Sequence, residues 1–200
     1  MFNLLAVNNN LPVKTVPELI AYAKKNPGRL TMGSGGNGTT GHLGGELFKA
    51  MTGTFIVHVP YRGSPQAIND LMSGEIQLMF DNISSIGPHA KAGRVRGIAV
   101  SGPRRSPVFP DLPTVAEAGV AGYETVAWGG VIGPANLPRE VLTRLHSEIR
   151  KALSAPALVE RYRSLDTETD GGTPEEFLAL VRSEAPKWAE VIRRAGAKVD

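Results

Sequence analysis

The sequence has 200 residues, is 42% hydrophobic and carries a formal net charge of +3, so it can bury a core as one large or two small domains. Its Lys and Arg residues are scattered rather than interleaved with aromatic residues, which argues against a nucleic-acid partner. It lacks cysteine, which excludes disulfides and thiolate metal sites, and no apolar run approaches the roughly 18 residues of a membrane span, so we expect no membrane insertion.

Short apolar runs alternate with amphipathic segments through the first half of the chain. The run at 2–7 predicts a buried strand, and Thr15 followed by Glu18 predicts the capped start of a helix. Further strands are expected at 29–32, 54–59, 75–80 and 95–100, with helices at 40–52, from 64 onward and from 81 to about 93. This alternation predicts an α/β fold with a parallel sheet and right-handed crossovers.

The second half of the chain is different, because it supplies helices but hardly any sheet. Residues 101–124 are irregular and proline-rich, and 125–134 is predicted to be a strand. Helices are expected at 139–153, 156–165 and 174–195, with Pro186 kinking or splitting the last. Such helices need a layer to pack on, so we expect this part to complete a lobe whose opening strands lie outside the chain.

Gly33, Gly35 and Gly38 lie between a predicted strand and a predicted helix with the spacing G-x-G-x-x-G. We refer to residues 33–39 as the glycine loop. The spacing raises the alternative of an NAD(P)-dependent enzyme, but the acidic residue expected about 20 positions later for the ribose is replaced by Tyr61 and Arg62. We find no nucleophile–base–orienter set and no metal spacing among the histidines, so the sequence favours a non-catalytic site without a metal or cofactor.

Three loops, at 33–42, 60–65 and 81–84, follow consecutive predicted parallel strands, and each opens a helix. Such loops meet at one edge of a sheet, where helix N-termini attract anions. Ser64 is predicted to cap one helix, and Asp81 or Asn82 is predicted to cap the next. Asp81 alternatively contacts a ligand amine or hydroxyl. His42 either packs or reaches the ligand, His58 is expected in the core, and Tyr61 and Trp128 either pack or face the crevice.

Five segments carry a resemblance that spans the chain: LPVKTVPELIAYAKKNPGRL, SGGNGTTGHLGGELF, VHVPYRGSPQAINDLMSGEIQLMFDN, PDLPTVAEAGVAGYE and GGTPEEF. Together they resemble the Bug family of extracytoplasmic solute receptors, which serve tripartite tricarboxylate transporters. The resemblance implies a periplasmic-binding-protein-like (Venus flytrap) fold. It also implies a periplasmic location, membrane transporter subunits as partners, and a small mono- or dicarboxylate bound between two lobes without catalysis, often partly through water. A sensory role for the same module stays open.

The resemblance also implies a set of ligand-binding residues and a division into lobes. One wall is expected from Ser34, Gly36, Gly38, Thr39 and His42, with additions from Gly63, Ser64 and Asp81, and with Tyr61 and Trp128 beside it. Residues 8–122 would form the second lobe, and 1–7 and 123–200 the crossovers and the C-terminal part of the first. Family chains open with a signal peptide and further strand–helix units. We therefore expect this chain to lack half of the site and to bind weakly or not at all.

Overall fold

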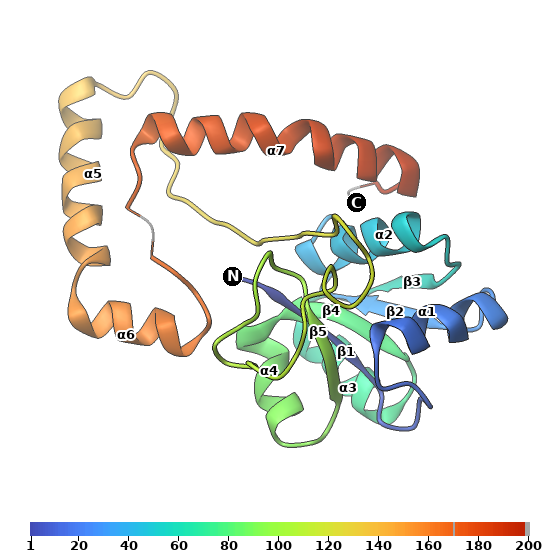
Figure 1. The fold of residues 1–200 in the computed structure, drawn as a ribbon. Helices are drawn as coiled ribbons and strands as arrows, with labels where there is room; N and C mark the ends of the chain where they lie inside the picture. The colour runs from blue at the N-terminus through green and yellow to red at the C-terminus, as the bar shows by residue number, and fades with distance from the viewer. Residues whose placement is uncertain (170, 199–200) are drawn as a thin grey trace.

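The computed structural model describes residues 1–169 and 171–198; residues 170, 199 and 200, within the predicted range 123–200, lie outside the described residues. Its body is a five-stranded sheet in the order β3-β2-β4-β1-β5, covered by helices (Figure 1). The elements are β1 (Asn3–Val7), α1 (Val16–Lys25), β2 (Thr31–Ser34), α2 (Thr40–Thr52), β3 (Val57–Pro60), α3 (Ser64–Ser73), β4 (Leu78–Asn82), α4 (Ile83–Lys91), β5 (Arg96–Val100), α5 (Arg139–Leu153), α6 (Pro156–Ser164) and α7 (Pro174–Ala195).

The sheet is parallel except at its fourth position. β2 pairs in parallel with β3 and β4, whereas β1 lies between β4 and β5 and runs antiparallel to both. The expectation of a uniformly parallel sheet is therefore wrong at β1. All five residues of β1 are buried, and a continuous apolar run marks a strand as buried without indicating its direction.

Each face of the sheet carries its own core. Along β4, Phe80 belongs to the cluster formed with α1 and α2, while Met79 belongs to the cluster formed with α3 and α4. This alternation follows from the two-residue period of a strand. Because β2, β3 and β4 run parallel, their carboxyl ends lie at one edge of the sheet, which we call the rim, and α2, α3 and α4 begin there.

The expected helices are present, and a capping threonine marks the start of α1, α2 and α7. Thr15 Oγ1 accepts a hydrogen bond from Glu18 N (3.3 Å) at the start of α1, as predicted. α2 spans the predicted Thr40–Thr52 and ends at Gly53 in the left-handed conformation, which favours glycine. The predicted cap at Ser64 is wrong: the N-cap of α3 is Gly63, and the Ser64 hydroxyl bonds Asp81 instead.

The predicted strand at 125–134 does not form. Val126 makes an isolated bridge with Phe2, and Ala127 N donates to Met1 O (2.9 Å), after which residues 128–134 continue without regular structure. The run includes Gly129 and Gly130, and glycine inside a strand weakens it. Two segments far apart in sequence, 1–2 and 126–127, therefore leave the sheet side by side.

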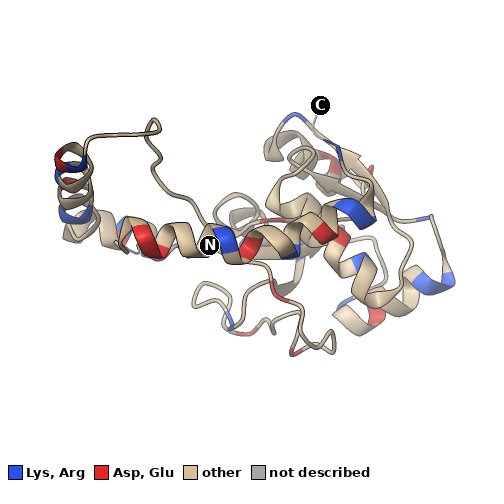
Figure 2. Ribbon diagram, turned by 90° about the horizontal axis from the view of Figure 1, so that it is seen from above, with Lys and Arg blue, Asp and Glu red and all other residues tan. Residues whose placement is uncertain are grey.

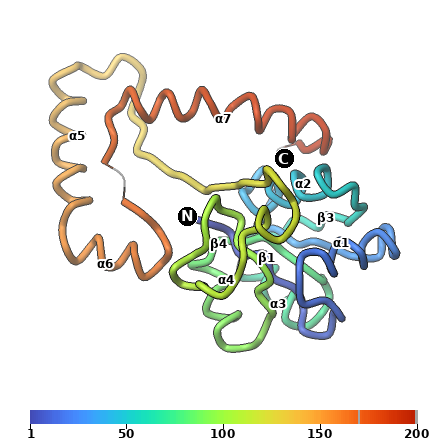
Figure 3. Tube along the Cα trace, viewed as in Figure 1, coloured from blue at the N-terminus to red at the C-terminus, as the bar shows by residue number. Residues whose placement is uncertain are grey.

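Beyond this point the chain forms the C-terminal arm, residues 128–195. α7 lies over α2, while α5 and α6 stand away from the sheet (Figures 1 and 3). α5 and α6, described throughout, contain no buried residue, and α7 continues through Pro186 rather than splitting there. Val141, Leu142 and Leu145 on α5 are 39–49% exposed, so the apolar stripe that they form on this helix stays largely uncovered.

Charged residues of both signs are distributed over the helices rather than concentrated on one element (Figure 2). No helix within 1–169 and 171–198 combines the length and the apolarity that crossing a bilayer requires.

Candidate ligand-binding site

The three predicted loops do meet at the rim, and glycines make the approach possible. A Cβ on Gly41 would lie 2.2 Å from the Phe80 carbonyl oxygen, so the first turn of α2 sits directly on β4. A Cβ on Gly35 would lie 3.1 Å from Ser64 Oγ, which places the glycine loop against the start of α3. The spacing of these glycines thus serves close backbone packing around the rim.

Internal hydrogen bonds hold the glycine loop in shape. Ser34 Oγ accepts from Gly36 N (3.2 Å), and Thr39 Oγ1 donates to Gly36 O (2.8 Å) and accepts from His42 N (3.4 Å) as the N-cap of α2. Gly36 and Gly38 have φ values of 133° and 77°, where a side chain would be strained. Gly38 is exposed, so the loop presents its backbone at the surface.

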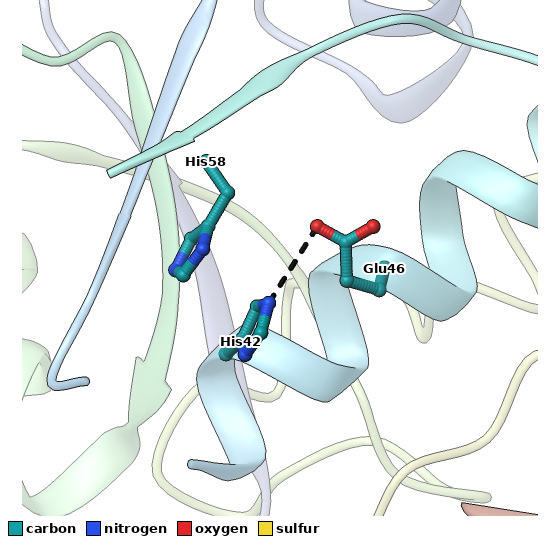
Figure 4. A group of neighbouring side chains, drawn as sticks. All are labelled: His42, Glu46 and His58. Carbon is teal, nitrogen blue, oxygen red and sulfur yellow. Dashed lines mark ion pairs between the residues drawn. The ribbon is translucent and has the colours of Figure 1, made fainter. Parts of the chain in front are cut away.

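His42 and His58 lie behind this loop as a stacked pair, with ring centroids 3.8 Å apart and planes 8° from parallel (Figure 4). Gly38 N donates to His42 Nδ1 (3.0 Å), and His58 Nε2 lies 2.7 Å from Ser34 Oγ. His42 is buried. The prediction that His58 packs in the interior missed its bond to Ser34, because no spacing in the sequence links residues 34 and 58.

Both imidazoles are held in their neutral form. Burial lowers the pKa of His42, with Glu46 opposing and Lys49 reinforcing the shift. Burial, His42 and Lys49 lower the pKa of His58 to about 4. The Gly38 amide also requires an unprotonated Nδ1 on His42. At neutral pH the pair therefore carries no charge.

His42, Glu46 and His58 bring donor atoms within 4.8 Å of one another, the usual starting point for a metal site (Figure 4). The geometry does not suit a cation. The lone pairs of an imidazole lie in its ring plane, so these stacked rings direct them within two nearly parallel planes rather than toward one cation. Lys49 Nζ also lies 2.6 Å from Glu46 Oε1 already. The two histidines of this cluster are better explained as an uncharged support for the loop.

Asp81 has the most unusual environment at the rim. It is 6% exposed; Oδ1 accepts from Ser64 Oγ (2.8 Å), and Oδ2 is buried without a hydrogen-bond partner among the described residues. Burial raises its pKa, against the hydrogen bonds from Ser64 and Asn82. Asp81 is not a helix cap, since Asn82 occupies that position for α4. The interpretation of Asp81 as an N-cap is therefore wrong.

Two further polar atoms near the end of β4 are buried and unpaired within the described part of the chain. They are Asn3 Nδ2 and Asn82 Oδ1, and these residues face each other across β1 and β4. Buried polar groups normally have a partner. Together with Asp81 Oδ2, they give the rim hydrogen-bonding capacity that residues 1–169 and 171–198 leave unused.

Tyr61 and Trp128, two of the predicted site residues, direct the Tyr61 hydroxyl and the Trp128 ring toward other parts of the protein rather than toward the rim. The Tyr61 hydroxyl donates to Asp70 Oδ2 (2.7 Å), and burial, this bond and nearby carboxylates raise its pKa to about 12. Trp128 is 40% exposed and packs edge-to-face on Phe177 of α7, 5.6 Å between centroids. The other predicted residues, all on the three rim loops or the elements flanking them, are Ser34, Gly36, Gly38, Thr39, His42, Gly63, Ser64 and Asp81.

The neutral histidine pair has a consequence for stability against pH. The pKa of His58 is about 4 in the folded protein and 6.5 ordinarily, so between these values the unfolded chain binds more protons. The free energy of unfolding should therefore fall as pH drops through this window, by at most about 1.4 kcal/mol per pH unit for one proton. Urea unfolding at several pH values should show a smaller pH dependence in His58→Gln than in the original chain. His146→Gln, at a half-buried residue of α5 whose Nε2 lies 3.0 Å from the Gly172 carbonyl oxygen, is the control. An unchanged slope in His58→Gln would contradict the assignment.

Comparisons with known proteins agree with this arrangement. The family described as "Tripartite tricarboxylate transporter family receptor" matches residues 2–197. A UPF0065 protein from Pseudomonas sp. (strain P51), in the tcbD-tcbE intergenic region, is 39% identical over 95% of this chain and 57% of its own length. The solved structure of R. palustris Rpa4515 with adipate has a TM-score of 0.90 and 40% identity, covering 98% of this chain and 66% of that one. The periplasmic binding protein BugD has a TM-score of 0.88 and 30% identity, covering 98% and 67%.

The chain thus spans between about three fifths and two thirds of the length of these relatives. None of the comparisons supports the alternative of a nucleotide-dependent enzyme. The match over nearly all of the sequence, the α/β architecture and the likeness to BugD lead to one assignment. The chain belongs to the tripartite tricarboxylate transporter receptor family, as its resemblance to Bug receptors predicted.

Proposed function

We propose that this protein is a non-catalytic receptor that binds a small mono- or dicarboxylate at the rim and presents it to the membrane subunits of a tripartite tricarboxylate-type transporter. One observation carries the proposal: three helix N-termini meet around Asp81, a buried carboxyl group with a free oxygen. The adipate bound by the similar protein Rpa4515 supports a carboxylate as the ligand class.

The chemistry of the rim suits an anion that also offers a hydrogen. The N-termini of α2, α3 and α4 supply free N–H groups and the positive ends of their helix dipoles. Asp81 Oδ2 accepts a hydrogen from a ligand hydroxyl or from a bridging water. Arg62, exposed beside this rim, offers a cation to a second acidic group.

A catalytic interpretation of the Ser34–His58 contact is unfavourable, although 2.7 Å is a reasonable distance between a nucleophile and a base. The Ser34 hydroxyl already bonds Gly36 and His58 within the protein, so it is not free to attack a substrate. His58, whose pKa is about 4, is also a weak base at neutral pH. The contact supports the loop rather than a reaction.

The proposed division places residues 8–122 in one lobe, with 1–7 and 123–200 as crossovers and the rear part of the other. The adjacent segments 1–2 and 126–127 support this division, since they leave the body of the sheet together. The apolar stripe of α5 supports it too, because an amphipathic helix buries its apolar face against another layer. A periplasmic location is part of the same proposal, supported by the likeness to BugD.

The binding affinity expected for a carboxylate held by one wall alone is modest. A hydrogen bond to a charged group contributes about 1.5–3 kcal/mol, whereas micromolar binding needs about 8 kcal/mol after ordering and desolvation costs. We therefore expect this chain to bind a carboxylate with a dissociation constant in the millimolar range. Binding by a second wall would strengthen it.

The test is a titration of the ¹⁵N-labelled chain with adipate, malate and NAD(P), followed through its amide resonances. We expect shifts from adipate or malate in the loops at 35–39, 63–66 and 81–84, and none there from NAD(P). Adipamide, the uncharged diamide of adipate, is the matched control and should produce no comparable shifts. Saturable NAD(P) shifts in the glycine loop, or carboxylate shifts confined to other regions, would contradict the proposal.

A further inference from the structure

The histidine pair reaches the glycine loop through separate hydrogen bonds from two different elements. His42, in the first turn of α2, accepts the amide hydrogen of Gly38 (3.0 Å). His58, on β3, contacts Ser34 Oγ (2.7 Å), which in turn accepts the amide hydrogen of Gly36 (3.2 Å). Both ends of the loop are therefore tied to one stack of two rings.

We propose that His42 and His58 are positioning residues: as a neutral stacked pair, they hold the glycine loop in the shape that presents its amides to an anionic ligand. This inference rests on the proposed function for its binding consequences, whereas its effect on the loop can be measured without ligand. Neither ring needs to touch the ligand. The pair acts through Ser34, Gly36 and Gly38.

The hydrogens available in the pair explain why it must be neutral. Ser34 has one hydroxyl hydrogen and two acceptors within reach, the Gly36 carbonyl oxygen (3.1 Å) and His58 Nε2 (2.7 Å). Donation to the nearer acceptor requires an unprotonated Nε2 on His58. His42 must likewise keep Nδ1 free for Gly38. A proton on His42 Nδ1 would place two N–H donors, that of His42 and that of Gly38, against each other and would release the loop.

The charged groups facing the pair are Glu46 and Lys49, both on α2. Glu46 Oε1 lies 3.8 Å from His42 Nε2 and favours a proton there, while Lys49 opposes a charge on either ring. Acidification therefore adds a positive charge next to Lys49 and to a second ring. We expect it to loosen the glycine loop.

Two substitutions of His58 separate positioning from simple packing. His58→Gln keeps a terminal group that bonds Ser34 but loses the ring, whereas His58→Phe keeps a ring on His42 but loses the bond. Positioning predicts that the Gln variant resembles the original chain and the Phe variant does not. Packing alone predicts the opposite order.

The experiment measures amide hydrogen exchange of Gly36 and Gly38 without ligand, relative to core amides of β4, at about pH 7. In His58→Phe we expect about a tenfold loss of protection at these two amides, which corresponds to the loss of one hydrogen bond. His58→Gln and the control His146→Gln should retain protection. Exchange normalised to β4 distinguishes a loosened loop from a protein that fails to fold.

Adipate titrations of the same proteins add the functional readout. The dissociation constant should rise about tenfold in His58→Phe, change little in His58→Gln, and depend less on pH in His58→Gln than in the original chain. Equal protection of Gly36 and Gly38 in all variants, or greater loss in Gln than in Phe, would overturn the inference. If adipate does not bind the original chain, the proposed function fails, while loss of protection in His58→Phe still supports positioning of the loop.

Discussion

Replacement of Gly41 by alanine is expected to lower the free energy of unfolding by about 3 kcal/mol and to abolish carboxylate binding. The added Cβ would lie 2.2 Å from the carbonyl oxygen of Phe80, a backbone atom in the middle of the sheet. Because that oxygen has little room to move, the start of α2 must lift from β4. Thr39 and the glycine loop would then separate from Asp81. Urea unfolding and the adipate titration measure the two losses.

The sign of the stability change in Gly41→Ala tests the packing, because helix propensity alone would make alanine more stable than glycine by about 1 kcal/mol. A stabilised Gly41→Ala protein would show that α2 does not sit on β4 as described. Gly129→Ala is the matched control: its Cβ meets nothing within 4 Å, so both stability and binding should be unchanged.

Substitution of Asp81 by asparagine is expected to weaken carboxylate binding at least tenfold without reducing stability at neutral pH. Asparagine keeps an oxygen for the Ser64 hydroxyl but removes the acceptor that Oδ2 offers to the ligand. The loss of one hydrogen bond to a charged group corresponds to about tenfold or more in affinity. Titration with adipate measures this change.

The stability half of this prediction follows from the raised pKa of Asp81. Burial is the main cause, so the folded state disfavours the charged carboxylate and binds a proton more tightly than the unfolded chain. The contribution of this group to the free energy of unfolding therefore decreases as pH rises through its ordinary and raised pKa, and it is lowest at neutral pH. Asparagine removes that penalty.

Asp111→Asn, at an exposed position in the loop after β5, serves as the control and should alter neither quantity. If Asp81→Asn weakened the fold and left adipate binding intact, Asp81 would be a structural residue and the proposed site would be wrong. The combination of lost affinity with retained stability separates a ligand contact from a packing contact.

Much of the local structure was predictable because its causes lie close together in the sequence. Thr15 and Glu18 marked the start of α1, and the apolar periodicity after Thr40 gave both ends of α2. Strand–loop–helix order placed three loops at the carboxyl ends of neighbouring strands, which is where the rim lies. The glycine spacing was recognisable too, although it fits several ligands.

The sequence by itself determined the α/β alternation, most helix starts and the family, because caps, periodicity and ordered motifs are local patterns read along the chain. Only the tertiary structure decided that β1 runs antiparallel, that 125–134 stays irregular, that Ser64 bonds Asp81, and that His58 joins His42 behind Ser34. Strand direction and the partner of a buried polar group depend on which distant segments meet. No pattern within one segment contains that information.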